Sequence, residues 1–253
     1  MHIKGAIFDL DGTLLDTEPI YDAAAQQLID EFGNGEKIEW NIKRHIIGTP
    51  PKVHCKIFVD SYKIKLTPEE FQKRRDALLV EPFKKCQFKK GARETTHKCK
   101  YELGIKVGIA TSSLRKDFEN KTNHLKDWLN EDIDIVVTTD DGRIKAGKPA
   151  PDIFILGAKE LGLKPEECIV FEDSGSGVQA AISSGAAVVV AVMEECQRNT
   201  LEGLVYDKNK TKLIVLDSMD QFDFNIIATL KINSDNRTYL QFFKYINSIL
   251  FIS

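Results

Sequence analysis

Two aspartates, Asp9 and Asp11, are separated by a single residue in the stretch FDLDGTLLDTEP, at the point where an apolar run ends. Carboxylates this close repel each other, and a cation between them relieves the repulsion. Oxygen donors with no histidine or cysteine nearby favour Mg²⁺. Gly12 permits a tight turn that would expose both side chains. The pair therefore indicates a magnesium site at the end of a strand.

Three later segments add side chains that suit the chemistry of phosphate esters. IATSS contains Thr111 and Ser112, GKPAPD contains Lys148, and VFEDSGSG contains Glu172 and Asp173. The Thr111 hydroxyl and the Lys148 ammonium, with nearby backbone N–H groups, can stabilise the charge that develops on phosphoryl oxygens. Asp173 follows another apolar run, so it would complete the set of metal ligands, with Glu172 beside it.

The carboxylates in such a site would have separate roles. A metal-bound carboxylate stays ionised and can attack a phosphorus atom, which gives an aspartyl phosphate. A second carboxyl that the metal does not fully neutralise can protonate the leaving alcohol and later activate water. Each feature alone also has a structural interpretation, as a strand-end turn, a solvated lysine or a helix N-cap. However, the four features follow one another in the order described, and each lies at a predicted strand end or just before a predicted helix. This arrangement favours the catalytic interpretation.

The stretch GRIKAGKP, residues 142–149, is close to a phosphate-binding P-loop but departs from it at one position. A P-loop has serine or threonine after its lysine, whereas this chain has Pro149. Proline also lacks the backbone N–H that a phosphate-binding helix start provides. We therefore do not expect a nucleoside triphosphatase of this type.

Five short apolar runs have the pattern of buried parallel strands, with helical segments between several of them. The segment KPAPDIFILGAKELG has prolines at its start and ends at Gly162, and SGVQAAISSG ends at Gly185. This alternation predicts an α/β fold with a doubly wound parallel sheet, in which ligands bind at the carboxyl ends of the strands. The expected strands are 5–10, 106–112, 133–139, 168–173 and 186–192.

Residues 17–88 break this alternation, because they contain no convincing strand. We expect three helices there. The first is capped by Thr17, the second opens near Thr49 and Pro50, and the third opens at Thr67 with a capping box. Such an insert would close over the strand ends, expel water and select the leaving group.

The predicted domain organisation has three parts. Residues 1–15 and 89–224 form the α/β core, and residues 16–88 form the small helical insert. Residues 225–253 form a C-terminal segment of uncertain role, rich in aromatic and aliphatic side chains and too short to span a bilayer. An additional helix or strand packed on the core is expected there, and an interface or membrane-surface contact is the alternative.

Composition limits the classes of partner. The chain has 253 residues, 42% of them hydrophobic and 29% charged, with a net charge of −3, so nothing indicates nucleic acid as a partner. No window reaches the roughly 18 apolar residues of a membrane span, and Asp9 interrupts the apolar run that a signal peptide would need. We expect a cytoplasmic protein whose partner is a small phosphorylated metabolite. The oligomeric state is not predicted.

These motifs jointly resemble the four signature motifs of the haloacid dehalogenase superfamily. The resemblance is carried by DLDGT, IATSS, GKPAPD and VFEDSGSGVQAA and extends from about residue 5 to about residue 224. It implies a Rossmann-like core with a small α-helical cap, which the insert matches. The stretches FDLDGTLLDTEPIY, ATSSLRKDFENKT and TTDDGRIKAGKPAPDIF are most similar to the pseudouridine-5′-phosphatase group of eukaryotic enzymes.

The resemblance also implies roles for individual residues. It makes Asp9 the nucleophile and Asp11 the general acid/base, with the Asp11 backbone carbonyl directed to Mg²⁺. The residues implied to hold the phosphoryl group are Thr111, Ser112 and Lys148. The residues implied to hold the metal are Asp9, Asp11, Asp173 and Glu172, the last in a supporting or ligating role. An aspartate two residues after the nucleophile indicates phosphate transfer rather than carbon–halogen chemistry.

The leading hypothesis is therefore a Mg²⁺-dependent phosphatase that hydrolyses a small phosphomonoester, a sugar or nucleoside monophosphate, through an aspartyl phosphate. Pseudouridine 5′-phosphate is the first substrate to test. One alternative is a phosphomutase of the beta-phosphoglucomutase type, which would isomerise a sugar phosphate without net release of phosphate. The other is a binding protein that has kept the fold without its activity, although the intact set of charged residues argues against it.

Overall fold

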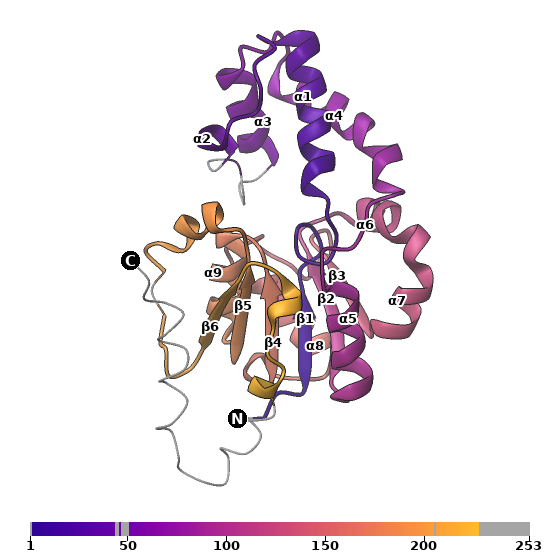
Figure 1. The fold of residues 1–253 in the computed structure, drawn as a ribbon, viewed down its shortest axis with the longest axis vertical. Helices are drawn as coiled ribbons and strands as arrows, with labels where there is room; N and C mark the ends of the chain where they lie inside the picture. Colours follow the sequence, from indigo (N-terminus) through magenta and orange to yellow (C-terminus); the bar gives the residue numbers. More distant parts are fainter. Residues whose placement is uncertain (1, 44–45, 47–50, 205, 228–253) are drawn as a thin grey trace.

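The computed structural model describes residues 2–43, 46, 51–204 and 206–227. Within these residues, six parallel strands form one sheet in the order β3-β2-β1-β4-β5-β6 (Figure 1). The strands are β1 (Gly5–Phe8), β2 (Lys106–Thr111), β3 (Ile135–Thr138), β4 (Cys168–Glu172), β5 (Val188–Val192) and β6 (Lys212–Leu216). The predicted doubly wound α/β fold and its five predicted strands are confirmed.

The sixth strand, β6, was missed by the sequence prediction. It lies at the edge of the sheet and pairs only with β5 among the described residues. Its residues are half-buried or exposed, unlike the fully buried residues of β4 and β5. An edge strand with partial burial lacks the continuous apolar run that identifies a central parallel strand.

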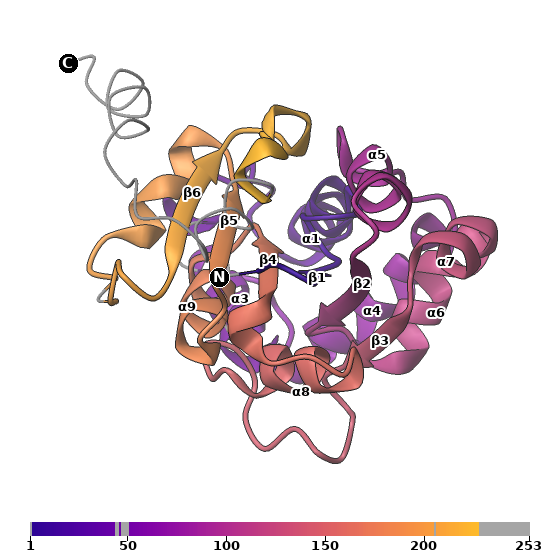
Figure 2. The ribbon, with the colours of Figure 1, turned by 90° about the horizontal axis from the view of Figure 1, so that it is seen from below.

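Alternate residues of each central strand face opposite layers of helices. Phe8 and Ile109 belong to one hydrophobic cluster, and Ile7 and Ala110 belong to the other. Helices α8 (Asp152–Glu160) and α9 (Gly175–Ser184) cover the second cluster, on the opposite side of the sheet from α5 (Ala92–His97) (Figure 2). Each face of the sheet is therefore covered, as a parallel sheet requires.

Strand β1 lies in the middle of the sheet, between β2 and β4. Phe8 is level with Ile109 of β2 and with Phe171 of β4, and the Asp9 backbone N–H donates to the Phe171 carbonyl at 2.9 Å. The chain builds β2 and β3 on one side of β1 and then crosses to build β4, β5 and β6 on the other side. The switch point, where ligands bind in such folds, therefore lies between β1 and β4. The residues after these strands therefore lie at the expected place for a site.

Among the described residues of the predicted insert, four helices pack on one another above the strand ends (Figure 1). They are α1 (Glu18–Phe32), α2 (Trp40–Lys43), α3 (Pro51–Ser61) and α4 (Pro68–Phe83). Ile29, Phe58 and Phe71 lie in their shared hydrophobic cluster, which is separate from the clusters of the sheet. The insert therefore has a core of its own. The boundaries at residues 16 and 88 remain a prediction.

The predicted starts of the insert helices agree with the structure in one case and disagree in another. The capping box of α4 is present, because the Thr67 hydroxyl accepts from the Glu70 backbone and the Glu70 carboxylate accepts from the Thr67 backbone. Thr17 precedes α1, but its side chain makes no capping hydrogen bond, so that detail was wrong. The second predicted opening, at Thr49 and Pro50, lies outside the described residues. Helix α2 was not predicted, because four residues carry too little periodicity.

The remaining helical segments connect the strands of the core. Helix α5 continues into a π-helical turn, Lys98–Glu102, and the others are α6 (Arg115–Thr122) and α7 (Lys126–Asp132). Short 3-10 turns occupy Asn123–Leu125, Pro165–Glu167, Glu195–Leu201 and Met219–Gln221.

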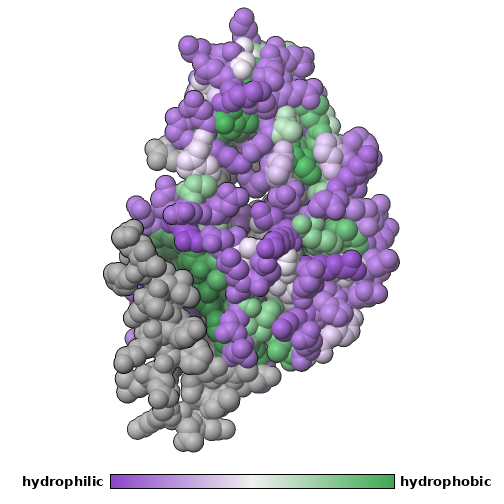
Figure 3. All heavy atoms as spheres, viewed as in Figure 1, coloured by the Kyte–Doolittle hydropathy of each residue, from purple (hydrophilic) through white to green (hydrophobic). Residues whose placement is uncertain are grey.

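The surface shown in Figure 3 is mostly hydrophilic, with hydrophobic residues in small patches over both the insert and the core. Within the described residues, no helix combines the length and the apolar character needed to cross a membrane. Of the C-terminal segment, only residues 225–227 are described, and Ile227 packs in the hydrophobic cluster of the sheet. The prediction for residues 228–253 lies outside the described part of the chain.

Candidate active site

Three carboxylates meet at the ends of β1 and β4. Asp9, Glu172 and Asp173 each offer an oxygen, and these oxygens lie within 4.8 Å of one another. Asp9 and Glu172 are buried, at 5% and 1% exposure, and Asp173 is partly buried. Three carboxylates with no histidine or cysteine in the group form a hard oxygen donor set, which fits Mg²⁺. The structure thus brings together residues that are far apart in the chain.

The turn after β1 is shaped around Asp173. Gly12 has φ +80°, and a Cβ atom there would lie 2.2 Å from Asp173 Oδ2. The neighbouring Thr13 hydroxyl donates to Asp173 Oδ1 at 3.0 Å. Glycine therefore allows both the left-handed backbone and the close approach of the acidic side chain.

Lys148 lies among the carboxylates. Its ammonium donates to Asp9 Oδ1 at 2.5 Å and to Glu172 Oε1 at 2.6 Å. The second oxygen of Glu172 accepts from the backbone N–H of Ser174 at 2.7 Å and from its hydroxyl at 3.0 Å. No helix starts at this lysine, because α8 begins at Asp152, which agrees with the exclusion of a P-loop.

The charges of this cluster are unbalanced. Burial raises the pKa of Asp9 to about 7; Lys148 opposes the shift, whereas Glu172 and Asp11 add to it. Burial, with the charges of Glu172 and Asp9, raises the pKa of Asp173 well above its ordinary value. One lysine faces three carboxylates, so full ionisation is unfavourable without a further cation. A divalent ion would restore the ionised forms.

Asp11 has different partners from Asp9. Lys121 donates to Asp11 Oδ1 at 2.5 Å, and the Ser113 hydroxyl donates to Asp11 Oδ2 at 2.7 Å. Burial raises the pKa of Asp11, but the charge and hydrogen bonds of Lys121 and Ser113 outweigh it, so that the pKa is lowered. The Asp11 carboxylate is not one of the clustered ligands. A metal contact through its backbone carbonyl remains a prediction.

The two predicted phosphate-binding residues of the second motif differ in exposure. Thr111 ends β2 and is buried, and its hydroxyl accepts from the Ser113 backbone N–H at 3.0 Å. Ser112, the next residue, is exposed. Both lie at the carboxyl end of β2, the strand next to β1, beside the residues after Phe8. Their role in phosphate binding stays a prediction.

Sequence reasoning missed Lys121, Ser113 and Tyr21 as members of the site. Lys121 donates to Tyr21 Oη at 3.1 Å as well as to Asp11 and Ser113. The available signal was weak: on the polar helix α6, Lys121 shares the buried face with Phe118 and Thr122. A lysine at an inward-facing helical position, three residues after a buried phenylalanine, is the pattern to look for.

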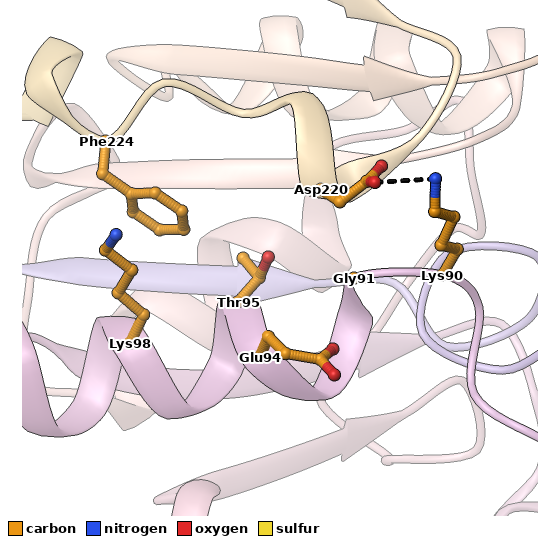
Figure 4. Close-up of a pocket in the computed structure, with 7 residues that line it drawn as sticks. All are labelled: Lys90, Gly91, Glu94, Thr95, Lys98, Asp220 and Phe224. Carbon is orange, nitrogen blue, oxygen red and sulfur yellow. Dashed lines mark ion pairs between the residues drawn. The ribbon is translucent and has the colours of Figure 1, made fainter.

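A concave surface lies away from the carboxylate cluster and contains none of its residues. Its lining residues are Lys90, Gly91, Glu94, Thr95, Lys98, Asp220 and Phe224 (Figure 4). Lys90 pairs with Asp220 at 2.8 Å, and the Lys98 ammonium lies 4.5 Å from the centre of the Phe224 ring. Both lysines thus already have partners, and we assign the groove no part in the chemistry.

Comparison with known proteins places this geometry in a family. Residues 6–191 match the family model described as "Haloacid dehalogenase-like hydrolase". The chain belongs to the haloacid dehalogenase-like hydrolases. The expected family resemblance is thereby confirmed, and the match includes every predicted site residue.

Two relatives of this chain carry the names of phosphatases. The chain is 37% identical to the "Probable pseudouridine-5′-phosphatase" of Saccharomyces cerevisiae, over 74% of this chain and 81% of that protein. It is 33% identical to the "Phosphorylated carbohydrates phosphatase" of Thermotoga maritima, over 76% of this chain and 86% of that protein. This haloacid dehalogenase-like hydrolase is therefore a phosphatase, as predicted.

A solved structure shows the same fold. The family IA, variant 3 hydrolase of this family from Entamoeba histolytica has a TM-score of 0.69 at 21% identity, over 91% of this chain and all of that chain. The α/β core with a helical cap is thus the shared architecture, and we call α1 to α4 the cap from here on.

Proposed function

We propose that this phosphatase hydrolyses a small phosphomonoester with Mg²⁺ as its metal, through an aspartyl phosphate on Asp9. The observation that carries the proposal is the cluster of Asp9, Glu172 and Asp173 oxygens within 4.8 Å, beside the ammonium of Lys148. Such a site can hold a cation and a phosphoryl group next to a buried carboxylate. The cation would neutralise charge on the phosphate and keep Asp9 ionised.

In the proposed mechanism, Asp9 attacks phosphorus, and the bond from phosphorus to the leaving oxygen breaks. Lys148, Thr111 and Ser112 stabilise the charge on the phosphoryl oxygens. Asp173 and Glu172 would hold the metal, with the backbone carbonyl of Asp11 as a further ligand. Lys148 also fixes the position of Asp9, because it bridges Asp9 and Glu172.

Asp11 supplies the proton chemistry of both half-reactions in this proposal. It protonates the departing oxygen and then takes a proton from the water that attacks the aspartyl phosphate. Its place supports this role, because it follows Asp9 by two residues and its carboxylate is directed to Lys121 and Ser113 rather than into the metal cluster. Water attack cleaves the bond between phosphorus and Asp9 and releases inorganic phosphate.

The substrate class comes from the relatives. Their names refer to pseudouridine 5′-phosphate and to phosphorylated carbohydrates, and in both the leaving oxygen belongs to a sugar hydroxyl. We propose a sugar or nucleoside monophosphate for this chain, with pseudouridine 5′-phosphate as the first to test. The cap lies above the strand ends, where it can cover the leaving group (Figure 1).

The test is a screen of sugar and nucleoside monophosphates with the full-length protein, in which free phosphate is measured with Mg²⁺ and with EDTA. The Asp9→Asn protein is the blank, and Asp30→Asn, a change on the exposed side of cap helix α1, is the matched control. Mg²⁺-dependent release lost only in Asp9→Asn supports the proposal. Isomerised sugar phosphate without free phosphate would instead indicate a mutase, and no turnover of any ester would indicate a binding protein.

A further inference from the structure

A buried lysine on the core contacts both the acid/base residue and the cap. Lys121, near the end of α6, has no exposed side-chain surface. Its ammonium donates to Asp11 Oδ1 at 2.5 Å, to Ser113 Oγ at 2.8 Å and to Tyr21 Oη at 3.1 Å. An ammonium group has three protons to donate, and Lys121 has three acceptors.

These contacts form a closed arrangement around Asp11. The Ser113 hydroxyl donates to Asp11 Oδ2 at 2.7 Å while it accepts from Lys121, so each carboxylate oxygen has its own donor. Two donors on two oxygens fix the plane of the carboxylate as well as its position. A fully satisfied polar network in a buried place holds one geometry firmly, because any rotation would leave a charged group without a partner.

The other side of Lys121 is made by the cap. Tyr21 comes from cap helix α1, and Phe83 is the last residue of cap helix α4. The Lys121 ammonium lies 4.5 Å from the centre of the Phe83 ring and 5.4 Å from that of Tyr21. The two rings also contact each other edge to face, with centroids 5.3 Å apart. The start of α1 and the end of α4, where the chain enters and leaves the cap, therefore both contact this lysine.

We propose that Lys121 is a positioning residue that fixes the carboxylate of Asp11 for attack by water and makes this position depend on the seating of the cap. The inference rests on the proposed function, because it assigns Asp11 its role as base. Tyr21 is the link to the cap. When α1 sits on the core, the Tyr21 hydroxyl accepts a hydrogen bond from one N–H of Lys121, and the other two N–H groups are directed at Asp11 and Ser113.

The test uses Lys121→Met with p-nitrophenyl phosphate and Mg²⁺. p-Nitrophenolate leaves without a proton, so kcat/KM reports attack by Asp9 and does not need Asp11 as an acid, whereas kcat contains the water-attack step. We expect kcat to fall by roughly 10- to 100-fold, as for partial loss of a general base, and KM to fall with it. The aspartyl phosphate should accumulate in acid-quenched samples.

Lys116→Met is the matched control, because Lys116 is an exposed lysine on the same helix. It should leave kcat and kcat/KM unchanged. If Lys121→Met lowers kcat and kcat/KM equally in a protein with native circular dichroism, Lys121 has a structural role only and the proposal is overturned. Unchanged kcat in that variant overturns it as well.

Tyr21→Phe keeps the ring and removes only the hydroxyl, so it tests the link to the cap even if Lys121→Met does not fold. We expect kcat to fall by about 2- to 10-fold with kcat/KM retained, the effect of one lost hydrogen bond. Unchanged kcat in Tyr21→Phe overturns the dependence on the cap. Failure of the wild-type protein to release phosphate would reject the proposed function instead, before any variant is compared.

Discussion

Two buried lysines stand beside two aspartates that are only two residues apart, and the balance of charge around them differs. Lys148 pairs with two of the three clustered carboxylates, those of Asp9 and Glu172, whereas Lys121 pairs with Asp11 and also contacts two hydroxyl groups. The pKa of Asp9 is raised to about 7 by burial, with Lys148 in opposition, and the pKa of Asp11 is lowered because Lys121 outweighs burial. Neighbouring residues of one type thus acquire opposite properties.

This difference in charge balance indicates which part of the site needs a metal. The Asp11 region is complete within the protein, because one cation meets one carboxylate. The Asp9 region has an excess of negative charge, and a divalent ion would balance it. The same motif therefore supplies a carboxylate for a metal and a carboxylate for proton transfer, and the following predictions test that division.

The largest expected effect is from Asp9→Asn. The amide cannot attack phosphorus, so the rate of phosphate release should fall by about 10⁴-fold or more. The protein should remain folded, because removal of a negative charge relieves the crowded cluster. The measurement is the rate of phosphate release with Mg²⁺. Retention of roughly a tenth of wild-type activity would show that another group is the nucleophile.

Lys148→Met should come next in effect. It leaves Asp9 and Glu172 buried without their shared cation, which destabilises a protein by about 3–5 kcal/mol. It should also lower kcat by roughly 10²–10³-fold, because a stabiliser of phosphoryl charge is lost. Urea unfolding without metal measures the first effect. The matched control is Lys145→Met, at an exposed position of the same loop, which should change neither quantity.

Metal binding should stabilise the fold more at pH 8 than at pH 5. The pKa values of Asp9 and Asp173 are raised in the metal-free folded state, so that state binds more protons than the unfolded chain above pH 4. The stability from these groups is therefore present at low pH and lost as pH rises to about 7. Added Mg²⁺ removes this loss.

The measurement is the difference in melting temperature with and without excess Mg²⁺, as a function of pH. Taking the difference cancels the contributions of carboxylates away from the cluster. Asp9→Asn serves as the comparison, because it should reduce the rise with pH. A difference that is the same at pH 5 and pH 8 would contradict the unbalanced charge of the Asp9 region.

Gly12→Ala should have the smallest effect of the four predictions. A Cβ at this position meets Asp173 Oδ2 at 2.2 Å, and the left-handed backbone is unfavourable for alanine by about 1–2 kcal/mol. We expect weaker Mg²⁺ binding as well, because Asp173 must move. Gly142→Ala is the matched control, since a Cβ there has no neighbour within 4 Å. Equal metal affinities in calorimetric titrations of the two variants would refute the role of Gly12.

Much of the fold was readable from local pattern. The central strands are continuous apolar runs, and helix α4 begins at the capping box of Thr67. The edge strand β6 was missed because partial burial removes the apolar run. The predicted capping bond of Thr17 was wrong, since its buried side chain makes no hydrogen bond to the first turn of α1. The local sequence therefore predicts an element well when the element is a fully buried strand or begins at a complete capping box.

By itself, the sequence determined the types of side chain at the strand ends: Asp9 and Asp11 after the first strand, Lys148 before a helix, and Asp173 after a later strand. Residue type and order sufficed there, because the carboxyl ends of parallel strands meet at one edge of the sheet. The tertiary structure alone decided that Lys121 belongs with Asp11. A lysine on a polar helix is normally solvated, and only the packing of core against cap removes it from water and gives its charge a partner.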